Sequence, residues 1–274
     1  HERAGARRLM LARRLAFGLS TLFGLKPRGF FIPYRHADQV PARAARGGYK
    51  ALEPLFAAAE PAFAEVLDGM DAYAGAFAAI GPDRPPAPRW DQDWFPRLDA
   101  AAAYLLVRER RPGRIVEVGS GHSTRFLCRA VADGALATIV TAIDQAPRAA
   151  IDGLGLNMIR GTLQQAGMAP FADLAAGDML IIDSSHILMP GTDVDILFNH
   201  ILPALPPGVL VHVHDVFLPD DYPPDWEWRG YNEQLGVAAL LQGGGFRLLW
   251  ASRYAATRMK RQVAASAAGR LPLK

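Results

Sequence analysis

Short apolar runs alternate with helical segments from residue 97 to residue 250, and this alternation constrains the fold more than any other feature. The runs are rich in Ile, Val and Leu, which is typical of strands buried on both faces of a parallel sheet. We therefore expect an α/β fold with a doubly wound, mostly parallel sheet. The expected strands are residues 114–118, 138–143, 156–160, 178–182, 208–214 and 246–250. The expected helices are residues 97–110, 123–131, 193–202 and 231–242.

The remaining segments predict how the chain is divided. Residues 1–80 are Ala-rich with helical spacing and predict a basic N-terminal helical extension. Residues 81–96 are rich in Pro and Trp, a composition that cannot continue a helix and predicts a semi-rigid linker. Residues 97–260 then form the α/β domain, and residues 261–274 a C-terminal tail.

Positive charge is concentrated at the start of the chain. The net charge is +3, yet residues 1–50 carry eleven Lys and Arg against Glu2 and Asp38. Such an arm could contact anionic lipid or nucleic acid. Its apolar residues do not form one clean helical stripe. This favours a basic helix that is solvated or that docks on residues 51–274, which carry a net negative charge. Contact with a membrane surface and assembly into a homo-oligomer both stay open.

Composition favours a cytoplasmic protein. Cys128 is the only cysteine, so no internal disulfide can form, which fits a reducing compartment. The best apolar run, Leu9–Leu25, is interrupted by Arg13 and Arg14 and predicts neither a membrane span nor a secretory signal.

Polar residues follow four of the predicted strands. They are the Glu117–Gly121 segment, Asp144, Asp183 and the pair His214 and Asp215. Ligands of open α/β sheets bind at the carboxyl ends of the strands. A buried core needs nothing polar at these positions, so the pattern predicts a functional site along that edge.

The first strand leads through Gly119-Ser120-Gly121 into a helix that Ser123 opens. Glycines let the backbone approach a ligand where side chains would clash. Asp144, at the end of the next strand, follows Gly121 by 23 residues. This spacing suits a carboxylate that accepts hydrogen bonds from both ribose hydroxyls of a nucleoside cofactor.

Two details favour S-adenosylmethionine (SAM) over a nicotinamide dinucleotide. A dinucleotide turn prefers a third glycine for close helix packing, and here that position is Thr124. Glu117 would repel a pyrophosphate but suits the cationic methionyl end of SAM, directly or through water. An NAD-dependent oxidoreductase is therefore the weaker alternative.

Three segments carry a resemblance to a known family. Ile115–Gly121 resembles the E-x-G-x-G cofactor motif of class I SAM-dependent methyltransferases. Ile182–His186 and Gly208–Pro219 resemble the fourth and fifth strand ends of the subset called methyltransferase family 24. The resemblance covers about residues 89–250 and implies a Rossmann-like methyltransferase sheet that uses SAM.

The resemblance also implies where SAM is held. Gly119, Gly121 and Asp144 should contact it, and the adenine should lie near the residues after the third strand. In related methyltransferases the segment before the first strand often closes over the cofactor, so Trp90 or Trp94 could contact adenine or acceptor, or anchor the core. The expected cofactor-binding residues are Glu117, Gly119, Ser120, Gly121, Ser123, Asp144, Gln145, Thr162 and Leu163.

The ends of the fourth and fifth strands supply the expected catalytic residues His186, His214 and Asp183. Methyl transfer to a hydroxyl needs its proton removed, which a histidine base or a divalent cation can do. A cation would be bound by Asp183, His214 and Asp215, as Mg²⁺ on oxygen ligands or as Mn²⁺, Fe²⁺ or Zn²⁺ with histidine. The residues leave both devices open. His212, inside its strand, is expected to be a core histidine.

The expected function is SAM-dependent O-methylation of a small molecule or sugar hydroxyl. Residues 218–228 could form a lid over the acceptor or a Trp-anchored loop. Asn232 is the expected N-cap of the following helix, although Glu233 or Gln234 could bind the acceptor. Nucleic acid is disfavoured as a substrate because Asp183-Ser184-Ser185-His186 is not the segment typical of base methylation. A non-catalytic SAM-fold scaffold is the remaining alternative.

Overall fold

The computed structural model describes residues 2–42, 45–81 and 84–272, with side chains from residue 12 onward. Two residues of the predicted linker, Pro82 and Asp83, and the last two of the predicted tail lie outside the described residues. The chain divides into two compact units, residues 1–45 and residues 46–274. The domain boundaries expected near residues 80, 96 and 260 stay a prediction.

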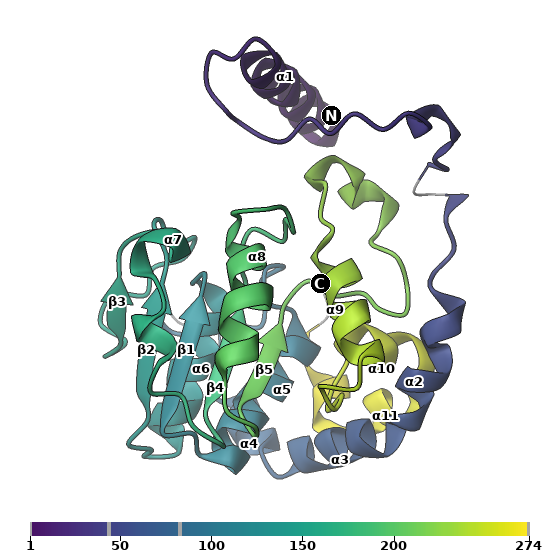
Figure 1. The fold of residues 1–274 in the computed structure, drawn as a ribbon. Coiled ribbons are helices and arrows are strands. Elements are labelled where there is room, and N and C mark those ends of the chain that lie inside the picture. The colour runs from purple at the N-terminus through teal and green to yellow at the C-terminus, as the bar shows by residue number, and fades with distance from the viewer. Residues whose placement is uncertain (1, 43–44, 82–83, 273–274) are drawn as a thin grey trace. The chain divides into compact units, whose positions relative to one another are not determined.

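A five-stranded, all-parallel sheet with the order β3-β2-β1-β4-β5 forms the centre of the larger unit (Figure 1). The predicted Rossmann-like α/β fold is confirmed. The strand order reverses between β1 and β4, which is where such sheets open a crevice for a ligand. The strands are β1 (Arg114–Val118), β2 (Ile139–Ile143), β3 (Asn157–Ile159), β4 (Met179–Ile182) and β5 (Leu210–Val213).

Alternate strand residues face opposite sides of the sheet, and helices cover both sides. Ile115 and Ile181 belong to the core that includes α5 and α6, whereas Val116 and Ile182 belong to a second core beneath α7 and α8. These helices are α5 (Arg97–Arg110), α6 (His122–Asp133), α7 (Leu163–Ala166) and α8 (Asp193–Ile196). A π-helical turn, η5 (Leu197–Ile201), continues α8, and α9 (Glu233–Gln242) follows β5.

Helices from before and after the sheet join the same core. Phe63 and Phe77 are almost completely buried, and α3 packs on α5. The reason is that α5 buries Ala100–Ala103 as well as its larger residues, so the sheet covers one side of it and other helices must cover the rest. These helices are α2 (Glu53–Ala58), α3 (Glu60–Asp71), α4 (Ala74–Ala78), α10 (Ser252–Arg258) and α11 (Lys260–Ala265).

The predicted strand at residues 246–250 is wrong. The structure assigns no strand to this run, and the sheet ends at β5. The Trp250 ring instead lies 6.0 Å from that of Phe63, and Leu248 packs on the same core. The apolar residues of 246–250 therefore pack against helices, and such packing selects the same local composition as strand pairing does.

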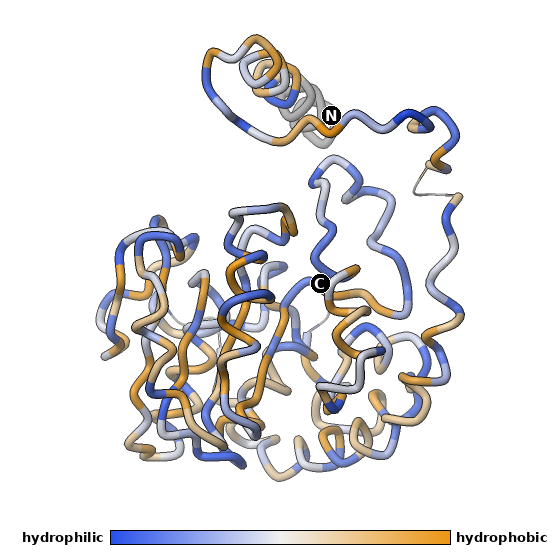
Figure 2. The backbone as a smooth tube through the Cα atoms, in the orientation of Figure 1, coloured by the Kyte–Doolittle hydropathy of each residue, from blue (hydrophilic) through white to orange (hydrophobic). Residues whose placement is uncertain are grey.

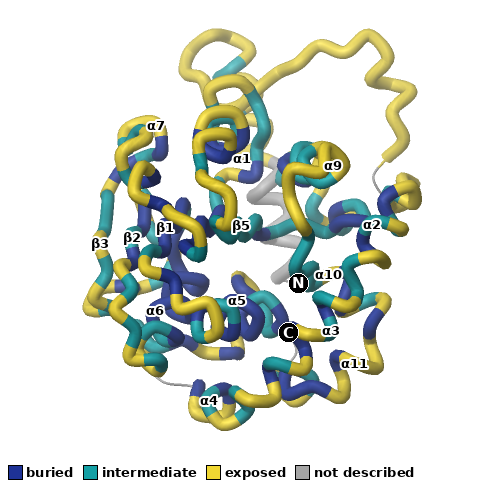
Figure 3. Tube along the Cα trace, turned by 60° about the horizontal axis from the view of Figure 1, so that its bottom comes forward, coloured by how far each residue is buried: buried dark blue, intermediate teal, exposed yellow. Residues whose placement is uncertain are grey.

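The smaller unit consists of α1 (Glu2–Leu22) and the chain that follows it, which includes the 3₁₀ turn η1 (Ala37–Gln39). Figure 3 shows the segment after α1 exposed along most of its length. Among the described residues, no helix is long and apolar enough to cross a membrane. Further 3₁₀ turns in the larger unit are η3 (Lys50–Leu52), η4 (Ala169–Phe171), η6 (Leu202–Ala204), η7 (Pro224–Arg229) and η8 (Ala267–Arg270).

Candidate active site

The turn after β1 brings three strand ends together. Gly119 has φ +86°, a conformation that favours glycine. A Cβ at this position would lie 1.8 Å from the carbonyl oxygen of Asp183 at the end of β4. The Gly119 N–H donates to the carbonyl of Ile143 at the end of β2, at 2.9 Å. Gly119 is therefore required because the chain passes directly against the backbone of β4.

Ser120 and Asp144 form the part of the turn that fits a nucleoside. The Ser120 hydroxyl donates to Asp144 Oδ2 at 2.9 Å, and the Ala146 N–H donates to Oδ1 at 2.8 Å. Asp144 is half-buried, and each carboxylate oxygen keeps a lone pair for a ribose hydroxyl. A Cβ at Gly121 would meet nothing closer than 3.9 Å, so the turn is open there. These residues fit the adenosyl group of SAM.

Glu117 and Ser123 lie beneath this turn rather than on its open side. Glu117 has no exposed surface, and it accepts hydrogen bonds from Ser123 at 2.5 Å and Thr124 at 2.6 Å. Burial raises the pKa of Glu117 to about 8 despite these bonds. The Thr124 hydroxyl also accepts from the Gly121 N–H at 2.9 Å. The residue in the third-glycine position therefore ties the turn to the first turn of α6.

The three other expected cofactor residues follow the ends of β2 and β3. Gln145 is exposed beside Asp144. Thr162 is the N-cap of α7, and its N–H donates to the side chain of Gln165 at 2.9 Å. Leu163 is 3% exposed and packs in the second core. In this structure Thr162 and Leu163 stabilise the start of α7.

His186 is the centre of a buried cluster that joins β4, β5 and α9. Its Nδ1 lies 2.8 Å from Glu233 Oε2, and both side chains are buried. Its Nε2 lies 3.5 Å from Asp183 Oδ1 and 3.6 Å from Asp215 Oδ2. His186 has φ +59°, and its carbonyl accepts the N–H groups of Asn232 and Glu233 at 3.1 and 3.3 Å. The start of α9 therefore holds both the backbone and the ring of His186.

The surrounding carboxylates decide the charge of this ring. Burial by itself would lower the pKa of His186, but hydrogen bonds to Asp183 and Glu233 and attraction by Asp215 outweigh it and raise the pKa to about 10. Burial likewise would raise the pKa of Asp183, yet the neighbouring His214 and His186 hold it below its usual value. Without a bound ligand, His186 is therefore an imidazolium among carboxylates at neutral pH.

His214 lies next to this cluster, directly after β5. Its Nε2 is 2.9 Å from the carbonyl of Trp94, and 3.6 Å from Asp215 Oδ1. Its Nδ1 is buried without a hydrogen-bond partner among the described residues. The ring of His212 stacks 5.9 Å away, and burial lowers the pKa of His212 to about 3, so this side chain is neutral in the core as its position inside the strand predicts.

The predicted metal ligands do not fit a cation in this arrangement. Among the described residues, no group of three His, Cys, Asp or Glu side chains could hold a metal ion. The physical reason is that the His186 ring stands between Asp183 and Asp215, while His214 directs its Nε2 at a backbone carbonyl. The metal site of Asp183, His214 and Asp215 is therefore not supported.

An aromatic loop, residues 217–231, lies against His186. The Tyr231 ring is 4.5 Å from that of His186, and it contacts Tyr222 and Trp226 of the same loop. The guanidinium of Arg229 stacks on Trp226 at 4.1 Å. The side chains pack on one another and on His186 together, so this loop is anchored by its aromatic residues and also borders the site.

Some functional positions escaped the sequence analysis. The sequence suggests only helix capping or acceptor binding for Glu233, because no local pattern pairs this residue with a histidine 47 residues away. Asn232 precedes α9 but makes no side-chain cap; its Oδ1 accepts from the Leu188 N–H at 2.7 Å instead. Asp99 of α5 faces His214, and its pKa is raised chiefly by burial.

The two tryptophans before the sheet have different environments. The Trp90 indole is buried and donates to the carbonyl of Phe77 at 2.9 Å, which makes it a core anchor. Trp94 is 51% exposed, and the guanidinium of Arg148 lies over it at 5.0 Å. Arg148 also neighbours the open side of Gly121, so Trp94 is the one placed near the expected cofactor crevice.

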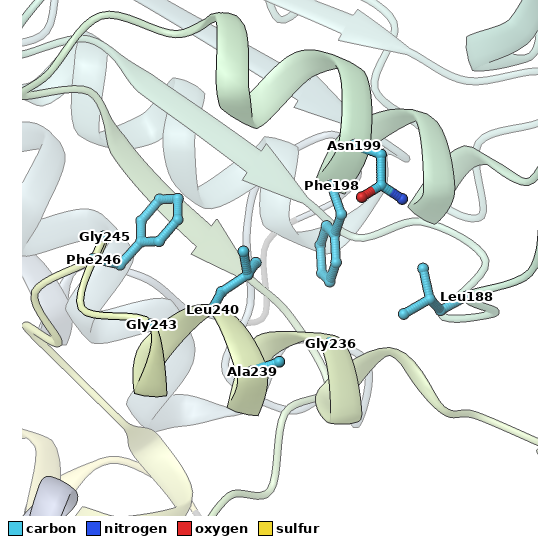
Figure 4. Close-up of a pocket in the computed structure, with 9 residues that line it drawn as sticks. All are labelled: Leu188, Phe198, Asn199, Gly236, Ala239, Leu240, Gly243, Gly245 and Phe246. Carbon is cyan, nitrogen blue, oxygen red and sulfur yellow. The ribbon is translucent and has the colours of Figure 1, made fainter.

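An apolar groove of about 430 Å³ lies apart from this cluster, between η5 and α9 (Figure 4). Leu188, Phe198, Leu240 and Phe246 point into it, together with Ala239. None of the described residues that line this groove has an ionisable side chain. The groove therefore supplies no base for proton transfer, whereas the strand ends carry histidines and carboxylates.

Comparison with known proteins agrees with this geometry. The family model described as a methyltransferase domain, methyltransferase family 24, matches residues 116–216. No curated protein and no solved structure matches the chain. The matched segment contains the glycine turn, Asp144, His186 and the end of β5. With the parallel sheet, this match identifies residues 116–216 as a class I SAM-dependent methyltransferase domain of that family.

Proposed function

We propose that this domain transfers the methyl group of SAM to a hydroxyl of a small molecule or sugar, and that His186 accepts the hydroxyl proton. The observation that carries the proposal is the buried pair of His186 and Glu233, at 2.8 Å, beside the ends of β4 and β5. Asp183 links this pair to the cofactor turn because its carbonyl lies against Gly119.

The chain's own residues would hold the cofactor at the turn. Asp144, fixed by Ser120, would accept the ribose hydroxyls, and the backbone around Gly121 leaves room for the nucleoside. When bound, SAM supplies an electrophilic methyl group on a positively charged sulfur. The residues of the turn and of the β4 end would align this group with the acceptor, which lowers the entropic part of the barrier.

Glu233 determines which nitrogen of His186 can act as the base. A carboxylate at 2.8 Å from Nδ1 keeps a proton on that nitrogen, so Nε2 carries the lone pair when the ring is neutral. Nε2 faces Asp183 and Asp215 at the strand ends, the side from which an acceptor would approach. A positive charge nearby competes for the same carboxylates, which lowers the pKa of His186 and favours the neutral ring in the loaded enzyme.

A hydroxyl acceptor explains why a base is built here. A hydroxyl must lose its proton during methyl transfer, whereas a neutral amine can attack without prior deprotonation. The aromatic loop around Tyr231 supports the same reading, because a packed aromatic wall limits water at the reacting atoms.

The test uses the full chain, SAM and a panel of hydroxylated small molecules and sugars, with matched amines. S-adenosylhomocysteine formation should be found with a hydroxyl compound, and His186→Asn should lower kcat by about 10²–10⁴-fold, the range of general-base catalysis. The thermal shift caused by S-adenosylhomocysteine should persist in that variant. Transfer to amines alone, or full activity of His186→Asn, would overturn the proposal. Cofactor binding without turnover on any acceptor would favour the scaffold alternative.

A further inference from the structure

Residues 12–42 expose an unusual number of large apolar side chains. Of the sixteen such side chains exposed in the described residues, ten lie between Leu15 and Val40. Leu25 is 80% exposed, Phe23 73% and Phe31 67%. Isolated exposed apolar residues are normal, but a concentration within one short unit marks a surface that contacts something apolar.

The fold of this unit gathers these residues from two segments. After α1 the chain turns back, because the Ser20 hydroxyl donates to the carbonyl of Lys26 and the Arg28 N–H donates to the Thr21 hydroxyl, both at 2.9 Å. The guanidinium of Arg28 then stacks on Phe17 of the helix at 5.3 Å. The end of α1 and the return segment thus form one body, visible as a loop beside the helix in Figure 1.

This folding back explains why the sequence showed no clean helical stripe. Leu15, Leu19 and Leu22 recur at helical spacing, but the other seven of the ten exposed apolar residues lie in the segment after the helix. Figure 2 shows that hydrophobic stretches alternate with hydrophilic ones along this unit. An apolar surface can therefore be assembled here without an amphipathic helix of the ordinary kind.

The same unit carries more positive than negative charge. Residues 12–42 contain three arginines close to the helix and its return, Arg13, Arg14 and Arg28, with Lys26 and Arg35 in addition. Asp38 is the only acidic residue in this range. Exposed apolar side chains interleaved with cations complement a surface that is apolar inside and anionic outside.

We propose that residues 12–42 bind the surface of a membrane that contains anionic phospholipids. The apolar side chains would enter the boundary between headgroups and acyl chains, and the cations would lie at the phosphates. Among the described residues no helix could span the bilayer, so the contact is with its surface. Nucleic acid would leave the exposed Leu and Phe side chains in water, and a second copy would bring like charges together.

The experiment is co-sedimentation of the full chain with two kinds of vesicle. One contains phosphatidylcholine alone, and the other contains phosphatidylcholine with about one phosphatidylglycerol in three lipids. The chain should bind the anionic vesicles at least about tenfold more tightly, and added salt should weaken this binding. Leu22→Glu should weaken it by about tenfold or more, because it places a carboxylate at an apolar anchor.

Leu235→Glu is the matched control, because Leu235 lies on α9 and is 52% exposed, close to the 58% of Leu22. It should bind vesicles like the unmodified chain. Equal binding to both vesicle types, or no effect of Leu22→Glu, would overturn the proposal. So would a dimer that Leu22→Glu dissociates, or binding to DNA that Leu22→Glu leaves unchanged. The thermal shift by S-adenosylhomocysteine reports separately on folding and on the methyltransferase site.

Discussion

Replacing Glu233 by Gln tests the central arrangement of the site with the smallest change of shape. The substitution keeps the length of the side chain and removes the negative charge that lies 2.8 Å from His186 Nδ1. A glutamine oxygen can still accept from Nδ1, so the neutral ring should keep its orientation. The imidazolium should lose part of its stabilisation, because the negative charge beside it is gone. The variant therefore separates charge from geometry.

The expected magnitude follows from the energy of that contact. A hydrogen bond to a charged group contributes about 1.5–3 kcal/mol, and about 1.4 kcal/mol corresponds to one pKa unit. The pKa of His186, about 10 in the unmodified protein, should thus fall by about 1–2 units. Loss of the orienting carboxylate should lower the maximal kcat by about 10–100-fold.

These two effects oppose each other at neutral pH. In both proteins activity should rise with pH as Nε2 loses its proton, but the rise should occur about 1–2 units lower in Glu233→Gln. Near pH 7 the larger neutral fraction offsets the weaker positioning, so the two rates should be similar. The deficit of the variant should appear only as the pH approaches 10.

The assay is S-adenosylhomocysteine formation from about pH 6.5 to 10.5 with a hydroxyl acceptor, beside NMR titration of ¹⁵N-labelled histidine, the range being chosen to bracket the ordinary histidine pKa and the raised one. Glu227→Gln is the control, because Glu227 is an exposed acid of the aromatic loop. A profile of Glu233→Gln that is lower by one constant factor at every pH would refute the coupling. A shift of the profile to higher pH would refute the assigned contact itself.

Three further results are expected from the same structure. Asp144→Asn should weaken S-adenosylhomocysteine binding by about tenfold or more in calorimetry, since the ribose loses a charged acceptor; unchanged affinity would contradict the assigned cofactor turn. Gly119→Ala should lower the free energy of unfolding by about 3–5 kcal/mol in urea melts, because its Cβ meets the backbone of Asp183, whereas Gly153→Ala, with φ +84° but open space, should cost about 1–2 kcal/mol. The free energy of unfolding should fall as pH rises from 6.5 to about 10, because the pKa of His186 is raised on folding and its contribution is complete only below the unfolded value; a stability that increases over this range would be inconsistent with the buried imidazolium.

Local chemistry allowed much of the architecture to be predicted. The bounds predicted for β1 and α5 agree with the structure, because strand composition, helical spacing and the Pro-Gly stop at Pro112 are written in neighbouring residues. The glycine turn that we propose for the nucleoside could be predicted for the same reason, since glycines and a strand-end acid occur at short, regular spacing. The family match supports the predicted methyltransferase fold.

Contacts between distant segments were decided only by the tertiary structure. Glu233 lies 47 residues from His186 and meets it because α9 folds back over the end of β4. The same packing put the His186 ring where a cation between Asp183 and Asp215 had been expected. Residues 246–250 pack on helices rather than joining the sheet, because apolar composition specifies burial but not the partner that covers it.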